Sequence, residues 1–146
     1  MRITLANFQL DAIRQLMEGM ASDIREIVLK SCTGSGKTII LTHFMDEYTK
    51  CYAGVVFVWL TPGKGDLENQ SKKKMDRYIY GASTKELHDV MTDGFTAGDF
   101  CFINWEKLTK GNLQKLSFLD FVLQKSRHAS QVKAGTIKIC TIHVKK

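Results

Sequence analysis

The feature that most constrains this chain is the Gly-Ser-Gly-Lys-Thr run at residues 34–38. A β-type run at 26–30 precedes it, and apolar side chains at helical spacing follow it over 41–48. Glycines let the backbone turn several N–H groups inward, and the positive end of the following helix faces the same point. The run therefore predicts a loop that binds the phosphates of a nucleotide. In such a loop Lys37 reaches the β- and γ-phosphates, and the hydroxyl of Thr38 binds Mg²⁺.

The rest of the chain alternates between strand and helix patterns. Runs of β-branched and aromatic residues predict strands at 54–60, of the kind buried on both faces, and at 100–103. Helix patterns begin after Asn7, which can cap the first helix, and span 67–80. This alternation predicts an α/β fold with a parallel sheet and helices on both faces, whose ligands gather at the carboxyl ends of the strands. The loops expected at that edge are 31–38, 61–66 and 104–110.

Charge divides the 146 residues into two parts. Of the 21 Lys and Arg residues, 15 lie in residues 1–120 together with all 15 Asp and Glu, and 6 lie in residues 121–146, which contain no acid. The basic excess is thus confined to the tail, which excludes a uniformly basic nucleic-acid-binding domain. We expect residues 1–120 to form a partial nucleotide-binding lobe and 121–146 a basic tail of uncertain origin.

Composition also excludes several protein classes. The longest apolar run, 54–60, is far shorter than the roughly 18 residues of a membrane span. The first 20 residues carry Asp11 and Glu18 in an amphipathic pattern, unlike a signal peptide. The four cysteines and four histidines are scattered without zinc-ligand spacing, which predicts reduced thiols. We therefore expect a cytoplasmic protein without a membrane partner.

The phosphate loop departs from the common pattern at Ser31, where a glycine is usual. Residues 31–38 resemble motif I of the superfamily 2 DEAD/DEAH-like helicases and translocases, in which that glycine is often replaced. Phe8-Gln9 resembles the aromatic–Gln element upstream of motif I, which implies that Gln9 recognises adenine by paired hydrogen bonds. The resemblance implies ATP and Mg²⁺ as cofactors, with Lys37 and Thr38 as catalytic residues and Thr38 as the metal ligand. The implied nucleotide site comprises Gln9, Thr33, Gly34, Ser35, Gly36, Lys37 and Thr38.

Two further segments extend the resemblance. Residues 59–62, with Leu67 and Gln70 after them, are similar to motif Ia, and 102–108 lie where a later strand delivers a second loop that contacts nucleic-acid backbone. Over roughly residues 5–115 the combination resembles the restriction (Res) subunits of type III restriction–modification enzymes. It implies a P-loop, RecA-like lobe that acts on double-stranded DNA beside a methyltransferase (Mod) subunit. The implied contacts to DNA phosphates come from Thr61, Gly63, Lys64, Asn104 and Lys107.

One element of this family is missing. ATP hydrolysis there needs a buried strand that ends in Asp-Glu, where the Asp holds Mg²⁺ and the Glu orients the attacking water. Asp46-Glu47 lies on the helix directly after Lys37, and Asp120 has no glutamate beside it. We expect a truncated lobe without the second RecA-like lobe. Its tail is either a frame-shifted or foreign segment or a divergent native end, in which 136–144 can form a strand.

Three functions remain open from the sequence. The first is the N-terminal motor lobe of an ATP-dependent DNA helicase or translocase, which couples ATP hydrolysis to translocation in the full-length enzyme. The second is a catalytically incomplete fragment that only binds a nucleotide or a partner. The third, a small P-loop kinase, needs clustered arginines, whereas the five arginines here are scattered. The lysine run at 72–74 is interpreted as a solvated helix surface.

Overall fold

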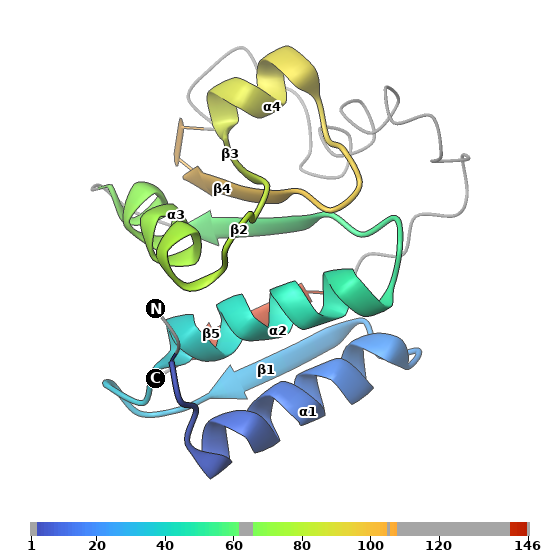
Figure 1. Ribbon diagram of the computed structural model, residues 1–146, viewed down its shortest axis with the longest axis vertical. Helices are drawn as coiled ribbons and strands as arrows, with labels where there is room; N and C mark the ends of the chain where they lie inside the picture. The colour runs from blue at the N-terminus through green and yellow to red at the C-terminus, as the bar shows by residue number, and fades with distance from the viewer. Residues whose placement is uncertain (1–2, 62–65, 105, 108–140, 146) are drawn as a thin grey trace.

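The computed structural model describes residues 3–61, 66–104, 106–107 and 141–145 (Figure 1). Their helices and strands follow one another as α1 (Asn7–Ala21), β1 (Glu26–Lys30), α2 (Lys37–Cys51), β2 (Phe57–Thr61), α3 (Leu67–Tyr78), β3 (Thr84–Glu86), α4 (Leu87–Asp93), β4 (Phe100–Asn104) and β5 (Thr141–Lys145). The predicted α/β class is confirmed. Strand β1 and helices α1, α2 and α3 also lie close to where the periodicity predicts them.

The described strands form two parallel sheets. Strand β1 pairs with β5, with Lys30 opposite Lys145, while β2, β4 and β3 form a three-stranded sheet in that order. In the second sheet Thr61 lies opposite Asn104 at the carboxyl ends of β2 and β4. The arrowheads of β1, β2 and β4 point the same way in Figure 1, so their carboxyl ends lie at one edge of the molecule. The phosphate loop and both loops expected to contact DNA leave from that edge.

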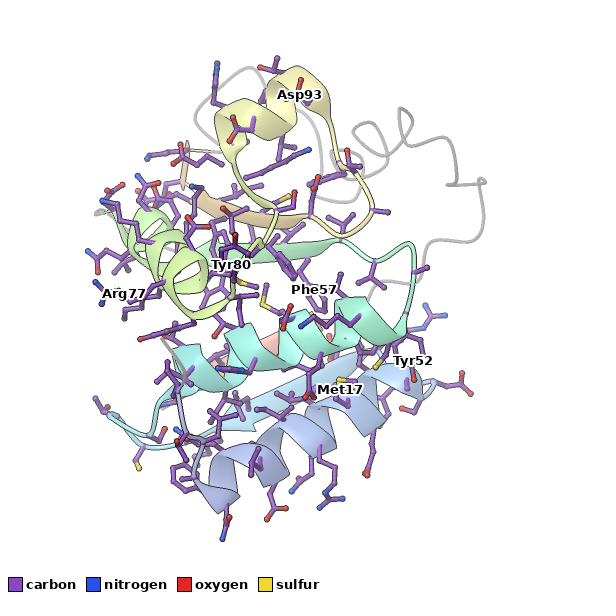
Figure 2. The ribbon with its side chains drawn as sticks, viewed as in Figure 1. Met17, Tyr52, Phe57, Arg77, Tyr80 and Asp93 are labelled. Atoms are coloured by element: carbon purple, nitrogen blue, oxygen red, sulfur yellow. The ribbon has the colours of Figure 1, made fainter. Side chains whose placement is uncertain are left out.

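Helix α2 joins the two sheets through a common apolar core. Phe44 of α2 is fully buried, and its ring meets that of Phe57 on β2 edge-on, with 5.6 Å between centroids. Phe57 in turn stacks on Phe100 of β4, and it lies between α2 and the three-stranded sheet in Figure 2. Ile27 of β1 and Ile142 of β5 pack against the same core from the other sheet. The core therefore holds the phosphate-loop strand and the three-stranded sheet in one unit.

Two local predictions are wrong. Asn7 is the first residue of α1 and Ala6 occupies the cap position, because the Gln9 side chain accepts the Ala6 N–H at 2.9 Å and does the capping from inside the helix. The strand predicted at 54–60 begins only at Phe57, and Leu60 remains 38% exposed. Strand β2 lies at an edge of its sheet, whereas β4 is central and buries all five of its residues.

Strand β3 and helix α4 have no counterpart in the sequence prediction. They are short, and β3 (Thr-Lys-Glu) has no apolar run. A buried ion pair holds this region, in which Lys85 of β3 approaches Asp99 at 2.7 Å. Asp99 also accepts a hydrogen bond from the Ser83 hydroxyl at 2.8 Å and from the Thr96 N–H at 2.8 Å. Contacts with the turn before β4 thus form a strand that local propensity does not predict.

Candidate nucleotide-binding site

The phosphate loop connects β1 to α2, and two of its glycines adopt left-handed backbone angles. The φ angles are 84° at Gly34 and 81° at Gly36, a region that side-chain-bearing residues rarely adopt. Gly36 is the cap residue of α2, and its carbonyl accepts the N–H of Ile40 at 2.9 Å. A Cβ at Gly36 would lie 2.6 Å from Nε2 of Gln9. The unpaired N–H groups at the start of α2 and its positive end therefore face the loop.

Hydrogen bonds within the loop hold it together. The Lys37 ammonium donates to the Cys32 carbonyl at 2.7 Å, and the Ser31 and Ser35 hydroxyls are hydrogen-bonded to each other. The Ser35 N–H also donates to the Cys32 carbonyl, at 3.3 Å. In the part of the chain that the structure describes, no ion pair involves Lys37. Its charge is thus held at the loop by a neutral oxygen and is free to attract an anion.

Gln9 is bound to this loop across 26 residues of sequence. Its Nε2 donates to the Ser35 carbonyl at 3.2 Å, while its Oε1 accepts the Ala6 N–H. The structure therefore brings Gln9 next to the phosphate loop. Both ends of its amide are engaged within the protein, so recognition of adenine would require it to exchange one of these bonds for the base.

Two cavities meet at the loop. The first, about 520 Å³, is lined by Phe8 and Ala12 of α1 and by residues of β1 and the loop. The second, about 470 Å³, is lined by the loop, the start of α2, Lys74 and Tyr78 of α3 and Val144 of β5. Thr33 and Gly34 line both. Volumes of this size suit a small-molecule ligand.

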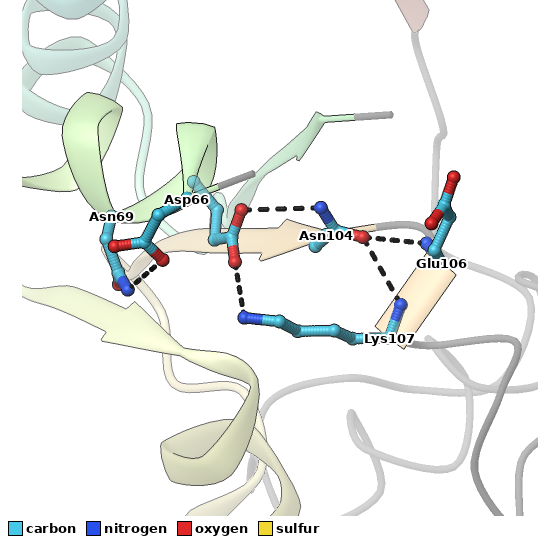
Figure 3. A network of polar contacts seen from close by, with 6 residues as sticks. Asp66, Asn69, Asn104, Glu106 and Lys107 are labelled. Carbon is cyan, nitrogen blue, oxygen red and sulfur yellow. Dashed lines mark hydrogen bonds and ion pairs between the residues drawn. The ribbon is translucent and has the colours of Figure 1, made fainter. Parts of the chain in front are cut away.

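The second predicted surface lies at the carboxyl ends of β2 and β4. Asn104 is buried, and its Nδ2 donates to Glu68 Oε2 at 3.4 Å while its Oδ1 accepts the N–H groups of Glu106 and Lys107 (Figure 3). The Lys107 ammonium lies 2.6 Å from Glu68 Oε1. Thr61 is buried beside Asn104 in register, and its hydroxyl has no hydrogen-bond partner among the described residues. Gly63 and Lys64 lie outside the described residues.

Glu68, at the start of α3, was not singled out from the sequence. Burial alone raises the pKa of its carboxyl, but hydrogen bonds from Lys107, the backbone and Asn104 outweigh burial, so the pKa lies below its ordinary value. The hydrogen bond to Glu68 and its charge raise the pKa of Lys107. An acidic residue in the first turn of a helix is so common that its sequence position alone does not distinguish Glu68.

The described residues offer no second acidic element at the loop. Neither cavity is lined by an Asp or Glu among them, and they contain no cluster of His, Cys, Asp and Glu that could hold a metal ion. Asp46 lies on α2 and pairs with Lys50 at 2.8 Å, whereas Asp120 lies outside the described residues. Thr38, which lines the second cavity, has a hydroxyl that could bind Mg²⁺ there.

The cysteines that the structure describes all have free thiols. Cys32, Cys51 and Cys101 are free cysteines, and burial, as the largest effect, raises the pKa of the Cys101 thiol to about 12. A thiol with so high a pKa is unreactive at neutral pH.

Among the helices that the structure describes, none combines the length and the apolar character needed to cross a bilayer.

The parallel strands, flanking helices and phosphate loop define an α/β protein of the P-loop class with a RecA-like arrangement. The comparison with protein families then identifies the particular group. Residues 2–138 match the family described as type III restriction enzyme, res subunit, and the chain belongs to this family. This confirms the resemblance to a DEAD-like helicase N-terminal lobe. A search of the curated proteins finds no match.

Proposed function

We propose that this chain is the ATP-binding motor lobe of a DNA helicase or translocase, the Res subunit of a type III restriction enzyme. In the full-length enzyme the lobe would couple ATP hydrolysis to movement along double-stranded DNA, beside a methyltransferase (Mod) subunit. Membership of the family and the phosphate loop at the carboxyl end of β1 support this proposal. The single observation that carries it is the loop geometry, in which two left-handed glycines precede a helix that begins at Lys37.

The nucleotide would lie across both cavities. Phe8, which is 57% exposed, lines the first cavity and offers its ring to the adenine base, which Gln9 would recognise. The backbone N–H groups of Thr33, Gly34, Ser35 and Gly36 would bind the phosphates. The Lys37 ammonium would leave the Cys32 carbonyl for the β- and γ-phosphates, since an anion is a stronger partner than a neutral oxygen. The Thr38 hydroxyl would hold Mg²⁺, which neutralises phosphate charge when it is bound.

DNA would bind at the loops after β2 and β4. Thr61 and Asn104 end neighbouring strands, so Thr61, Gly63, Lys64, Asn104 and Lys107 would face one stretch of phosphate backbone. The Lys107 side chain is 59% exposed even though it is paired with Glu68. Its ammonium therefore has donors left for a DNA phosphate. Contacts of this kind position the duplex without reading its sequence.

The test of nucleotide binding uses the purified chain and a fluorescent ATP analogue with Mg²⁺. Replacing Lys37 by Ala removes a charge-assisted contact worth about 1.5–3 kcal/mol, so we expect affinity to fall by about 10- to 100-fold. The matched control is Lys50→Ala on the same helix, whose ammonium pairs with Asp46 at the far end. Equal binding by the Lys37→Ala variant and the unmodified chain would refute the proposed site.

A second candidate is a module that binds a nucleotide without hydrolysing it. The observation in its favour is that no carboxylate among the described residues lines either cavity. A small-molecule kinase is less well supported, because no arginine lines a cavity in the described part of the chain. Assays of phosphate release and of phosphate transfer to a small acceptor separate these three functions.

A further inference from the structure

The three consecutive lysines of α3 lie in different surroundings. Lys72 is half-buried and pairs with Asp76 at 3.4 Å, whereas Lys73 and Lys74 are exposed. Lys74 lines the second cavity together with Tyr78, one helical turn further on. Lys74 is exposed, as the interpretation of the run as solvated surface predicts, and it also lines this cavity.

Helix α3 holds Lys74 in place through its neighbours. Met75, the next residue, is fully buried in the core, and Tyr78 packs against the same core. Residues 74 and 78 are four apart and thus share one face of the helix. Helix α3 also contacts α2, whose first residues line the same cavity. The position of Lys74 at the cavity follows from core packing and does not depend on a mobile loop.

Electrostatics favours an anion in this cavity. Lys37 and Lys74 both line it, together with the positive end of α2, and no Asp or Glu among the described residues does. None of the ion pairs found in the described part of the chain involves Lys74. Two ammonium groups without a carboxylate partner repel each other, and this repulsion is relieved when an anion lies between them.

The two cavities give the bound nucleotide a direction. The first lies on the α1 side of the loop and offers Phe8, Ala12 and one lysine, Lys30, whereas the second lies on the α3 side and offers two lysines, Lys37 and Lys74, beside the start of α2. A base in the first cavity therefore directs the phosphate chain past Thr33 and Gly34 into the second. The last phosphate of that chain reaches the side of the cavity formed by α3.

We propose that Lys74 binds the terminal phosphate of a nucleoside triphosphate, and that Tyr78 closes the cavity beside it with its hydroxyl as a second donor. This inference rests on the proposed function, because it assumes that the loop binds a nucleotide. It adds a specificity for the length of the phosphate chain. Lys74 contacts the terminal phosphate of ATP and finds no such group on ADP.

The test compares affinities for fluorescent ATP and ADP analogues in Mg²⁺. In the Lys74→Met variant, which keeps the stem and removes the charge, we expect ATP affinity to fall by about tenfold and ADP affinity to change less than about threefold. Lys73→Met is the matched control, since Lys73 is next to Lys74 in sequence and equally classed as exposed but does not line the cavity. That control should bind both nucleotides as the unmodified chain does.

The outcomes separate this inference from the proposed function. Loss of both affinities in Lys37→Ala together with unchanged ATP affinity in Lys74→Met would overturn the inference and leave the nucleotide site standing. Equal loss of ATP and ADP affinity in Lys74→Met would overturn the assignment to the terminal phosphate. Absence of nucleotide binding by the unmodified chain, with far-UV circular dichroism showing that it is folded, would overturn both. A Lys74→Arg variant, which keeps the charge, should restore part of the ATP preference.

Discussion

Gly36 shows how far a single residue limits the site. A side chain at Gly36 is disfavoured both by its left-handed backbone and by the nearby Gln9 amide. The two effects can be separated, because Gly34 also has a positive φ angle but has open space where a Cβ would lie. The residue that caps α2 thus also determines how closely α1 can approach the loop. Gln9 connects the two, through hydrogen bonds that use both ends of its side chain.

Substitution of Gly36 by Ala should destabilise the chain by about 1–2 kcal/mol from backbone strain alone. The collision with Gln9 adds to this, so Gly34→Ala is the control that carries strain without collision. Urea denaturation followed by circular dichroism measures both. The excess cost at Gly36 should disappear in a Gln9→Ala background, and if it persists the contact between Gln9 and the loop is not the cause.

The Glu68–Lys107 pair should make stability depend on pH. Because the folded pKa of Glu68 is lowered, its contribution is full above the unfolded value, about 4.3, and is lost as pH falls through the folded value. Because the folded pKa of Lys107 is raised, its contribution is full below about 10.4 and is lost as pH rises through the folded value. The pair therefore stabilises the fold most between these limits.

The Glu68→Gln substitution removes the negative charge of the pair. We expect it to lower the free energy of unfolding at pH 7 by about 1–2 kcal/mol. The difference in the free energy of unfolding between this variant and the unmodified chain should become smaller as pH approaches 4 and below. Urea midpoints at several pH values measure it, with Glu47→Gln on the exposed face of α2 as the control. A difference that does not vary with pH would show that packing, and not ionisation, gives Glu68 its role.

At the level of elements, β5 is the segment whose placement matters most. The sequence predicted a strand over 136–144, and the structure has one at Thr141–Lys145, while 136–140 lie outside the described residues. Strand β5 pairs in parallel with the strand that leads into the phosphate loop. One of its residues, Ile142, packs against the core, and another, Val144, lines the second cavity. The tail sequence thus contributes to the site even though it carries no acidic residue.

Docking of β5 is tested by Ile142→Ala. The loss of a half-buried side chain from the core should cost about 1–2 kcal/mol of unfolding free energy. Val144→Ala is the control, because Val144 is 47% exposed and loses less buried surface. Thermal and urea denaturation measure both variants. Equal stability of Ile142→Ala and the unmodified chain would show that β5 adds nothing to the core.

At the level of the whole molecule, the proposed site has cations without acids. Binding of a triphosphate needs the loop, Lys37 and Mg²⁺, whereas hydrolysis also needs a carboxylate to orient water. The described part of the chain supplies the first set at the cavities and not the second. Binding and turnover should therefore be separable in this protein.

We expect the purified chain to bind the fluorescent ATP analogue but to release no inorganic phosphate from ATP above background, with or without double-stranded DNA. Phosphate release is measured with a coupled colorimetric assay, and Lys37→Ala provides the background. DNA-stimulated turnover that disappears in Lys37→Ala would show that a carboxylate does reach the site. The chain would then be a complete ATPase.

Local sequence patterns predicted much of this protein correctly. Glycines, apolar spacing and hydrogen bonds among neighbouring residues determine the phosphate loop, the strand before it and the helix after it. Residues 26–51 could therefore be interpreted from the sequence alone. The apolar run at 100–103 predicted the burial of the first four residues of β4 for the same reason. These features depend on interactions within a few residues, which a linear sequence displays directly.

The placement of the functional side chains depended on the tertiary structure. Gln9 meets Ser35 across 26 residues and Glu68 meets Lys107 across 39, and no periodicity reveals such pairs. The three lysines at 72–74 are identical in sequence, yet only Lys74 lines the cavity, because the packing of Met75 determines which face of α3 meets α2. Contacts between distant segments form only when the core brings the helices and strands together, and the core is a property of the folded chain as a whole.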